Sequence, residues 1–146
     1  MKNSKKDTQM FLLDTNVFIA AIKAPKKYTK TLQLILGMIE DEDIQLVGDE
    51  FLVEEYIRYA EEFKSETASA ILGALLDKME LVQVGKNHIK ICKNYIKTPN
   101  LADIIHTAAC LKSDAIMITN DKHFNRIRDE GIIKIWSVTK AIKELL

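Results

Sequence analysis

The sequence predicts an α/β domain built around a parallel sheet. Short runs rich in β-branched and other apolar residues alternate with longer segments whose apolar residues recur at helical spacing. No internal repeat and no Pro/Gly/Ser-rich linker divides the 146 residues, so a single domain spanning residues 1–146 is expected. The apolar fraction of 47% and the charged fraction of 29% argue against disordered, collagen-like and coiled-coil chains.

Five short apolar runs are predicted to be the strands of this sheet. They cover residues 10–13, 44–47, 81–84, 115–118 and 132–136. The polar segment 1–9 before the first strand is expected to be flexible or weakly ordered. Right-handed crossovers between parallel strands bring the carboxyl ends of the strands to one edge of the sheet, where ligands of such sheets bind. Polar residues that directly follow a strand are therefore candidates for a functional site.

The segments between the strands are predicted to be helical. Helical spacing of apolar residues, with flanking caps, places them at residues 17–24, 30–40, 51–63, 66–79, 87–97, 101–111 and 139–146. Asp49 is expected to be the N-cap of the third helix, and Pro99 is expected to end the region before the sixth.

Two of the predicted strands run into carboxylates. Residues 10–13 lead directly to Asp14, and residues 115–118 lead through Thr119 and Asn120 to Asp121. An aspartate at the end of an apolar strand is expensive to desolvate unless it is paired or binds a cation. For either residue alone, a turn or helix-cap aspartate is the simpler interpretation. The two together, on adjacent central strands, favour a functional site.

Two further acids lie on predicted helices. Glu55 is surrounded by apolar residues near the start of its helix, although a solvent-facing glutamate beside Glu54 is the alternative interpretation. Asp103 would occupy the third position of a helix capped by Asn100, where a carboxylate is favoured by the helix dipole. A capping role for Asp103 is compatible with a functional one.

Four motifs, in this order, resemble those of PIN-domain proteins. They are Asp14-Thr15-Asn16, Glu55 after Phe51-Leu52-Val53, Asp103 in the segment LADIIHTAA at 101–109, and ITNDKHF at 118–124. The resemblance extends from about residue 11 to the C-terminus. It implies a three-layer α/β/α fold with a central parallel sheet of about five strands.

The resemblance also implies an Mg²⁺- or Mn²⁺-dependent endoribonuclease. Its acids would be Asp14, Glu55, Asp103 and Asp121, with Asn16 and Thr119 as supporting polar residues. Glu54 is the alternative to Glu55; adjacent helical residues point about 100° apart, so only one can face the site. Glu55 is preferred because the family acid follows an apolar run and precedes an apolar residue. Asp114 is excluded because it precedes a strand and should lie at the opposite edge of the sheet.

A divalent cation would resolve the repulsion among four converging carboxylates. Without it, at least one of their pKa values should be raised. Oxygen ligands and retained waters suit Mg²⁺ or Mn²⁺, which could activate water for attack on a phosphodiester. We expect Asp14 to be the central ligand, with Asp103 and Asp121 as further direct ligands. Glu55 would bind the ion through water or orient the attacking water.

The histidines and cysteines provide no alternative site. His106 is expected to be buried near Asp103, His123 to lie in a loop and His88 at the surface, and a zinc site would need more nitrogen or sulfur ligands. Cys92 and Cys110 are expected to be free thiols of a cytoplasmic protein. No apolar stretch reaches the ~20 residues of a membrane helix, and no secretory signal is recognised.

The charge balance gives no overall sign of nucleic-acid binding. There are 21 basic and 21 acidic residues, so any contact with RNA must be local. Two groups of lysines are candidates: Lys23, Lys26 and Lys27 after the first strand, and Lys86, Lys90 and Lys93 on one face of a predicted helix, continued by Lys97. An ordinary solvated face is the more common explanation of such a pattern.

Other functions are weighed against the ribonuclease. Many small relatives in the family are toxins of toxin–antitoxin pairs, which would imply an antitoxin partner and a homodimer. A non-catalytic PIN-fold module that binds RNA or protein would not need the intact acids. A structure-specific DNA nuclease would need additional helical elements. A phosphohydrolase with an aspartyl nucleophile would need a second aspartate where Asn16 stands.

Overall fold

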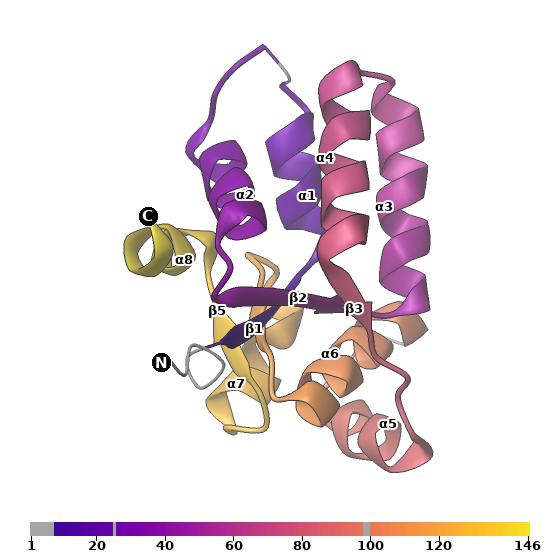
Figure 1. Ribbon diagram of the computed structural model, residues 1–146. Helices are drawn as coiled ribbons and strands as arrows, with labels where there is room; N and C mark the ends of the chain where they lie inside the picture. Colours follow the sequence, from indigo (N-terminus) through magenta and orange to yellow (C-terminus); the bar gives the residue numbers. More distant parts are fainter. Residues whose placement is uncertain (1–7, 25, 98–99) are drawn as a thin grey trace.

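The computed structural model describes residues 8–24, 26–97 and 100–146 (Figure 1). Its centre is a five-stranded sheet in the order β3-β2-β1-β4-β5, in which every neighbouring pair is parallel. The strands are β1 (Gln9–Leu13), β2 (Ile44–Gly48), β3 (Met79–Leu81), β4 (Ile116–Ile118) and β5 (Lys134–Trp136). The sequence prediction of a parallel sheet of about five strands is confirmed.

The central strand is β1, which pairs with β2 on one side and β4 on the other. Phe11 is opposite both Leu46 and Ile116, and Leu13 is opposite Ile118. The side chains of Phe11, Leu12 and Leu13 are all buried. A strand covered by helices on both faces is apolar throughout rather than alternating, which explains the continuous apolar run in this part of the sequence.

Helices cover both faces of the sheet, which confirms the predicted three-layer α/β/α architecture. Figure 1 shows α1 to α4 above the sheet, with α8 beside α2, and α5, α6 and α7 below it. The bounds are α1 (Thr15–Ile22), α2 (Lys30–Glu40), α3 (Glu50–Phe63), α4 (Glu66–Lys78), α5 (Lys86–Lys93), α6 (Leu101–Ser113), the 3₁₀ helix η2 (Lys122–Phe124), α7 (Asn125–Asp129) and α8 (Val138–Leu145).

Several helices begin at a side chain that accepts a hydrogen bond from a free backbone N–H of the first turn. These N-caps are Asp14, Thr29, Asp49, Ser65, Asn100, Asp121 and Ser137. A cap of this kind typically contributes about 1 kcal/mol to stability. Asp14 and Asp121 therefore have a structural role in addition to any chemical one, as the capping interpretation of the sequence anticipated.

Tyr56 joins α3 to the end of β1. Its side chain is fully buried, its hydroxyl donates a hydrogen bond to the carbonyl of Leu13, and its ring lies 4.7 Å from the ring of Phe18, centroid to centroid. This contact fixes the middle of α3 against the residue that precedes Asp14. It thereby positions Glu55, the neighbour of Tyr56 in the chain.

Some predicted boundaries were wrong. The third strand was expected at 81–84 and lies at Met79–Leu81, because α4 ends at Lys78 and the backbone is already extended at Met79. The first helix begins at Thr15 instead of residue 17, because Asp14 caps it directly. The helix predicted over 87–97 ends at Lys93, so Lys97 is not on the helical face assigned to it.

The short helices η2 and α7 were not predicted. Only Phe124 and Ile127 are buried there, which is too few to produce a recognisable helical period. The expected break at Pro99 and most of the segment expected to be weakly ordered, residues 1–7, lie outside the described residues, whereas Gln9 belongs to β1.

Three smaller predictions concern the cysteines, a membrane-spanning helix and His88. Cys92 and Cys110 are both free and buried. Within the described ranges, no helix combines the length and apolar character needed to cross a membrane. His88, expected at the surface, is half-buried.

Candidate active site

The four acids expected at the site line one hollow of about 180 Å³. Asp14 follows β1, Glu55 lies on α3, Asp103 in the first turn of α6, and Asp121 between β4 and η2. We call this cavity the acidic hollow; its remaining wall consists of Thr15, Asn16, Ile19 and Tyr59. Side chains separated by up to 107 positions in the chain therefore meet at the carboxyl edge of β1 and β4.

Asp14 is the most enclosed of the four acids, with 6% of its surface exposed. Its Oδ1 accepts a hydrogen bond from the Thr15 amide at 2.8 Å, and its Oδ2 accepts one from Thr119 Oγ1 at 2.7 Å. Burial raises the pKa of Asp14, although the bond from Thr119 opposes the shift. Thr119 Oγ1 also accepts a bond from the Asp121 amide at 3.0 Å. Thr119 thus connects two of the acids.

Glu55 faces the acidic hollow, whereas its neighbour Glu54 is exposed and does not line it. One carboxylate oxygen, Oε1, accepts hydrogen bonds from Thr15 Oγ1 at 2.5 Å and from His106 Nε2 at 3.0 Å. Partial burial would raise the pKa of Glu55, but the bonds from His106 and Thr15 outweigh it and lower the pKa. Glu55 is therefore a carboxylate at neutral pH.

His106 connects this carboxylate to Asp49. The imidazole is 1% exposed, with Nδ1 at 2.7 Å from Asp49 Oδ2 and Nε2 at 3.0 Å from Glu55 Oε1. Burial alone would lower the pKa of His106, but the hydrogen bonds and charges of Asp49 and Glu55 raise it to about 10. A protonated imidazole donates through both ring nitrogens, as this arrangement requires. The expectation that His106 is buried close to the site agrees with its position.

The sequence analysis missed the second role of Asp49. This residue caps α3 through the Leu52 amide, at 2.9 Å, and is 2% exposed while it holds His106. It directly follows β2. The rule that singled out Asp14, a polar residue immediately after a strand, would have singled out Asp49 as well.

Asp103 and Asp121 complete the wall of the acidic hollow. Burial, together with the negative charges of Asp14 and Asp121, raises the pKa of Asp103 to about 6, against the opposing effect of His106. Asp121 Oδ1 accepts a bond from the His123 amide at 2.9 Å and lies 3.1 Å from His123 Nδ1. His123 Nδ1 also lies 3.9 Å from Asp103 Oδ2. His123, which was given no role from the sequence, therefore contacts the acids.

Asn16 provides a separate test of whether a cation fits. Its side-chain oxygen Oδ1 is buried in the wall of the hollow without a hydrogen-bond partner among the described residues. A buried acceptor normally has a partner, so this oxygen calls for a water or a cation. Oxygen donors, combined with the raised pKa values of Asp14 and Asp103, match a hard divalent ion such as Mg²⁺ or Mn²⁺.

The arrangement of the carboxylates limits how they could hold such an ion. In the part of the chain that is described, no three Asp, Glu, His or Cys side chains are grouped closely enough to hold a metal directly. Both oxygens of Asp14 and the Oε1 of Glu55 already accept bonds from Thr15, Thr119 and His106. These residues therefore fit an ion that retains several waters, as Mg²⁺ does in proteins.

The lysines proposed to contact RNA lie away from the acids. Lys23, Lys26 and Lys27 are exposed at and after the end of α1, and Lys86, Lys90 and Lys93 are exposed on α5. Figure 1 shows the end of α1 and the helix α5 on opposite sides of the sheet. None of the six lines the acidic hollow. Asp114, excluded on sequence grounds, borders a different hollow with Thr8 and Gln9, at the start of β1.

The family model of the PIN domain matches residues 11–130, a span that contains all four acids. The chain belongs to the PIN-domain family. None of the curated proteins matches it in sequence.

Two solved structures share this PIN fold. One is VapBC2 from Rickettsia felis bound to a DNA fragment from its promoter, with 14% identity, a TM-score of 0.63, and coverage of 88% of this chain and 98% of the other. The second is VapBC-1 from nontypeable Haemophilus influenzae, with 20% identity, a TM-score of 0.63, and coverage of 90% and 99%. At these identities, the similarity establishes the fold of the present chain, which agrees with the fold predicted from its motifs.

Proposed function

We propose that this PIN domain is an endoribonuclease that hydrolyses RNA phosphodiester bonds with Mg²⁺ or Mn²⁺. The observation that carries the proposal is the acidic hollow, where four carboxylates from four elements meet and burial holds the pKa of Asp103 at about 6. A negatively charged pocket of this kind would repel a phosphodiester unless a cation is bound in it.

The residues divide into those that would hold the ion and one that would orient water. Asp14, Asp103 and Asp121 would hold it, directly or through water, with Asn16 Oδ1 as an additional acceptor. Once bound, a divalent ion lowers the pKa of its water and stabilises charge on the phosphate. Thr15 and His106 fix Oε1 of Glu55. The other carboxylate oxygen, which receives no protein hydrogen bond within the described ranges, is free to accept a bond from the attacking water.

We further propose that the chain acts as the toxin of a toxin–antitoxin pair. Both neighbouring structures are VapBC proteins, and they match this chain over nearly their whole length. A homodimer and an antitoxin partner are part of the proposal. Val53, Leu76, Met79 and Leu81 line an apolar depression on α3, α4 and β3, which suits a protein partner. We also propose a cytoplasmic location, which is consistent with the two free thiols.

The test is metal-dependent cleavage of single-stranded RNA. We expect the chain to cut RNA with Mn²⁺ or Mg²⁺ and to lose this activity in EDTA. Asp14→Asn should reduce the rate by at least about a hundredfold, because it removes the most enclosed acid of the hollow. The matched control is Asp114→Asn, at the opposite edge of the sheet, which should leave the rate unchanged.

Two outcomes would refute the assignment. Full activity of the Asp14→Asn variant, or cleavage that persists in EDTA, would show that the acidic hollow is not the active site. Equal cleavage of single-stranded DNA of the same sequence would replace the ribonuclease with a nuclease that does not distinguish RNA from DNA.

A further inference from the structure

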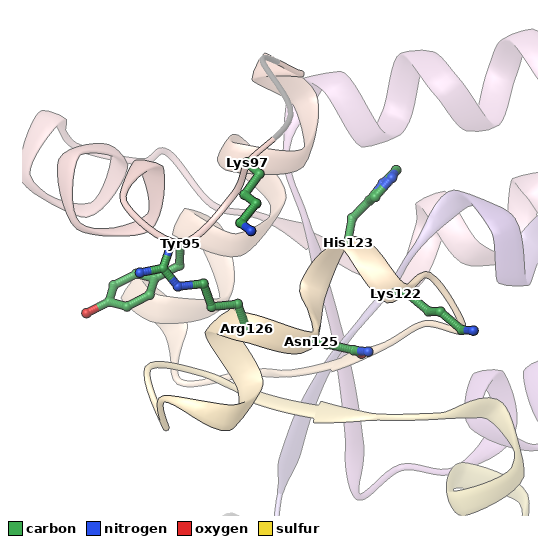
Figure 2. A pocket seen from close by; sticks show the side chains of 6 residues that line it. All are labelled: Tyr95, Lys97, Lys122, His123, Asn125 and Arg126. Carbon is green, nitrogen blue, oxygen red and sulfur yellow. The ribbon is translucent and has the colours of Figure 1, made fainter.

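A second cavity lies beside the acidic hollow, and its lining is basic. It has a volume of about 280 Å³ and lies between the segment after α5 and the turn formed by η2 and α7 (Figure 2). We call it the basic pocket; its lining residues are Tyr95, Lys97, Lys122, His123, Asn125 and Arg126.

The charge of this lining is unbalanced. It contains three permanent cations, Lys97, Lys122 and Arg126, and no carboxylate. In the described ranges, none of these three forms an ion pair with an acidic side chain within 4.0 Å. The whole chain has a formal net charge of zero. Three unpaired cations around one cavity therefore create a local positive field, which favours an anionic ligand.

Arg126 is held in place before any ligand arrives. Its guanidinium carbon lies 5.5 Å from the centroid of the Tyr95 ring, and its Nη1 donates to the carbonyl of Asn94 at 3.2 Å. Figure 2 shows Arg126 extended toward Tyr95 and Lys97 reaching down from the segment above. A guanidinium carries five N–H donors in a planar fork that matches the geometry of a phosphate, and most of them remain available here.

His123 forms the boundary between the two cavities. This residue lines the basic pocket, while its Nδ1 lies 3.1 Å from Asp121 Oδ1 and 3.9 Å from Asp103 Oδ2. Both aspartates line the acidic hollow. An anion in the basic pocket would therefore be separated from the acids by a single side chain.

We propose that the basic pocket binds a phosphate of single-stranded RNA next to the phosphodiester that is cleaved in the acidic hollow. This inference rests on the proposed ribonuclease function. A volume of 280 Å³ is near the lower end of small-ligand sites, about 300 Å³, which suits one nucleotide rather than a longer segment. An unpaired base can stack on the guanidinium or aromatic plane that Arg126 and Tyr95 provide. Double-stranded RNA would not offer its bases in this way.

The experiment measures RNA binding without cleavage. Fluorescence anisotropy of a short labelled single-stranded RNA is recorded over a series of salt concentrations, in EDTA, with the Asp14→Asn variant as the background. Adding Lys97→Gln and Arg126→Gln should weaken binding. The slope of log K against log salt should become shallower by about 0.7, because the pocket is proposed to neutralise one phosphate and each phosphate contact to a single strand contributes about 0.7.

A matched pair of substitutions is the control. Lys143→Gln and Arg128→Gln remove one lysine and one arginine that are exposed and outside the basic pocket, with Arg128 on the same helix as Arg126. They should leave the salt slope unchanged. Because Arg126 also packs on Tyr95, Lys97→Gln alone is compared with Lys143→Gln. This single variant should make the slope shallower by up to about 0.7, whereas Lys143→Gln should leave it unchanged.

Three results would overturn the proposal. They are an unchanged slope in the pocket variants, an equal change in the control pair, and displacement of the RNA by poly-glutamate as effectively as by unlabelled RNA. The last result would assign the pocket to acidic protein. The readout is binding, so failure of RNA cleavage would refute the ribonuclease function without altering this measurement.

Discussion

At the scale of single residues, the main feature is a carboxyl group in unfavourable surroundings. The side chain of Asp103 is 14% exposed, and Asp14 and Asp121 lie close enough to help burial raise its pKa from 3.8 to about 6. An acid whose pKa is raised by folding destabilises the folded state whenever it is ionised. The ionised carboxylate of Asp103 is thus electrostatically unfavourable in the folded protein, and a bound cation would offset this cost.

We predict that Asp103→Asn stabilises the metal-free protein. The pKa of Asp103 is higher in the folded state than in the unfolded state. The ionised carboxylate therefore increasingly destabilises the folded protein as pH rises from about 4 to above 6. At pH 8 the variant should gain about 1–2 kcal/mol in the free energy of unfolding, after discounting for partial exposure. Below pH 4 this gain should vanish. Urea denaturation in EDTA at both pH values measures it.

The control for this substitution is Asp77→Asn, on the exposed part of α4. Asp77 has no part in the acidic hollow, so its replacement should change stability little at either pH. A loss of stability by Asp103→Asn at pH 8 would contradict the electrostatic account.

At the scale of elements, His106 is the link that places α3 and α6 against the end of β2. It joins Asp49, the residue after β2, to Glu55 on α3, and it lies on α6 itself. Removing one partner of a buried charged pair leaves the other charge uncompensated, which typically costs about 3–5 kcal/mol. His106 is therefore a positioning residue for Glu55, and it also stabilises the packing of these elements.

We predict that His106→Gln lowers stability by about 3 kcal/mol at neutral pH. Because the pKa of His106 is raised from 6.5 to about 10 in the folded state, its contribution is fully present below pH 6.5. That contribution is lost as pH rises through 10. The wild-type protein should therefore lose stability between pH 6.5 and 10, and the variant should show less of this loss.

Chemical denaturation across this pH range measures the effect, with His88→Gln as the control. His88 is half-buried on α5 and does not line the acidic hollow. Equal pH dependence in the wild type and in His106→Gln would contradict the assignment of the proton to His106.

Elements with a cap and a long apolar period were predictable from the sequence, and the short ones were not. The helix α2 lies within its predicted bounds, because Thr29 caps it and Leu32, Ile35 and Leu36 recur at helical spacing. The strand β3 was misplaced because Met79 fits the helical pattern of α4 equally well. The helices η2 and α7 carry few buried residues, so their sequence shows no helical spacing of apolar residues.

The candidate site, too, was predictable only where a local sequence pattern marks a residue. Strand ends were visible in the sequence, so Asp14 and Asp121 could be identified and expected near each other. The contact of His106 with Asp49 and that of His123 with Asp103 join residues 57 and 20 positions apart, so they depend on how the elements that carry them pack. No local spacing encodes these contacts. The basic pocket combines residues 95–97 with 122–126 and was hidden for the same reason.

At the scale of the whole molecule, the sheet order explains why the acids meet. Because β1 is flanked by β2 and β4, the residues after these three strands reach one edge side by side. The helices α3 and α6 then bring Glu55 and Asp103 to that edge from opposite faces of the sheet. The acidic hollow is thus a consequence of the crossover topology, and no single element could form it.

The most direct test of this account is the anomalous scattering of Mn²⁺ in a crystal of the protein soaked with that ion. We expect an anomalous peak in the acidic hollow, within direct or water-mediated reach of Asp14, Asp103 and Asp121, and its loss in Asp14→Asn. Absence of a peak there at an Mn²⁺ concentration that supports RNA cleavage, or a peak only elsewhere on the molecule, would contradict the central claim.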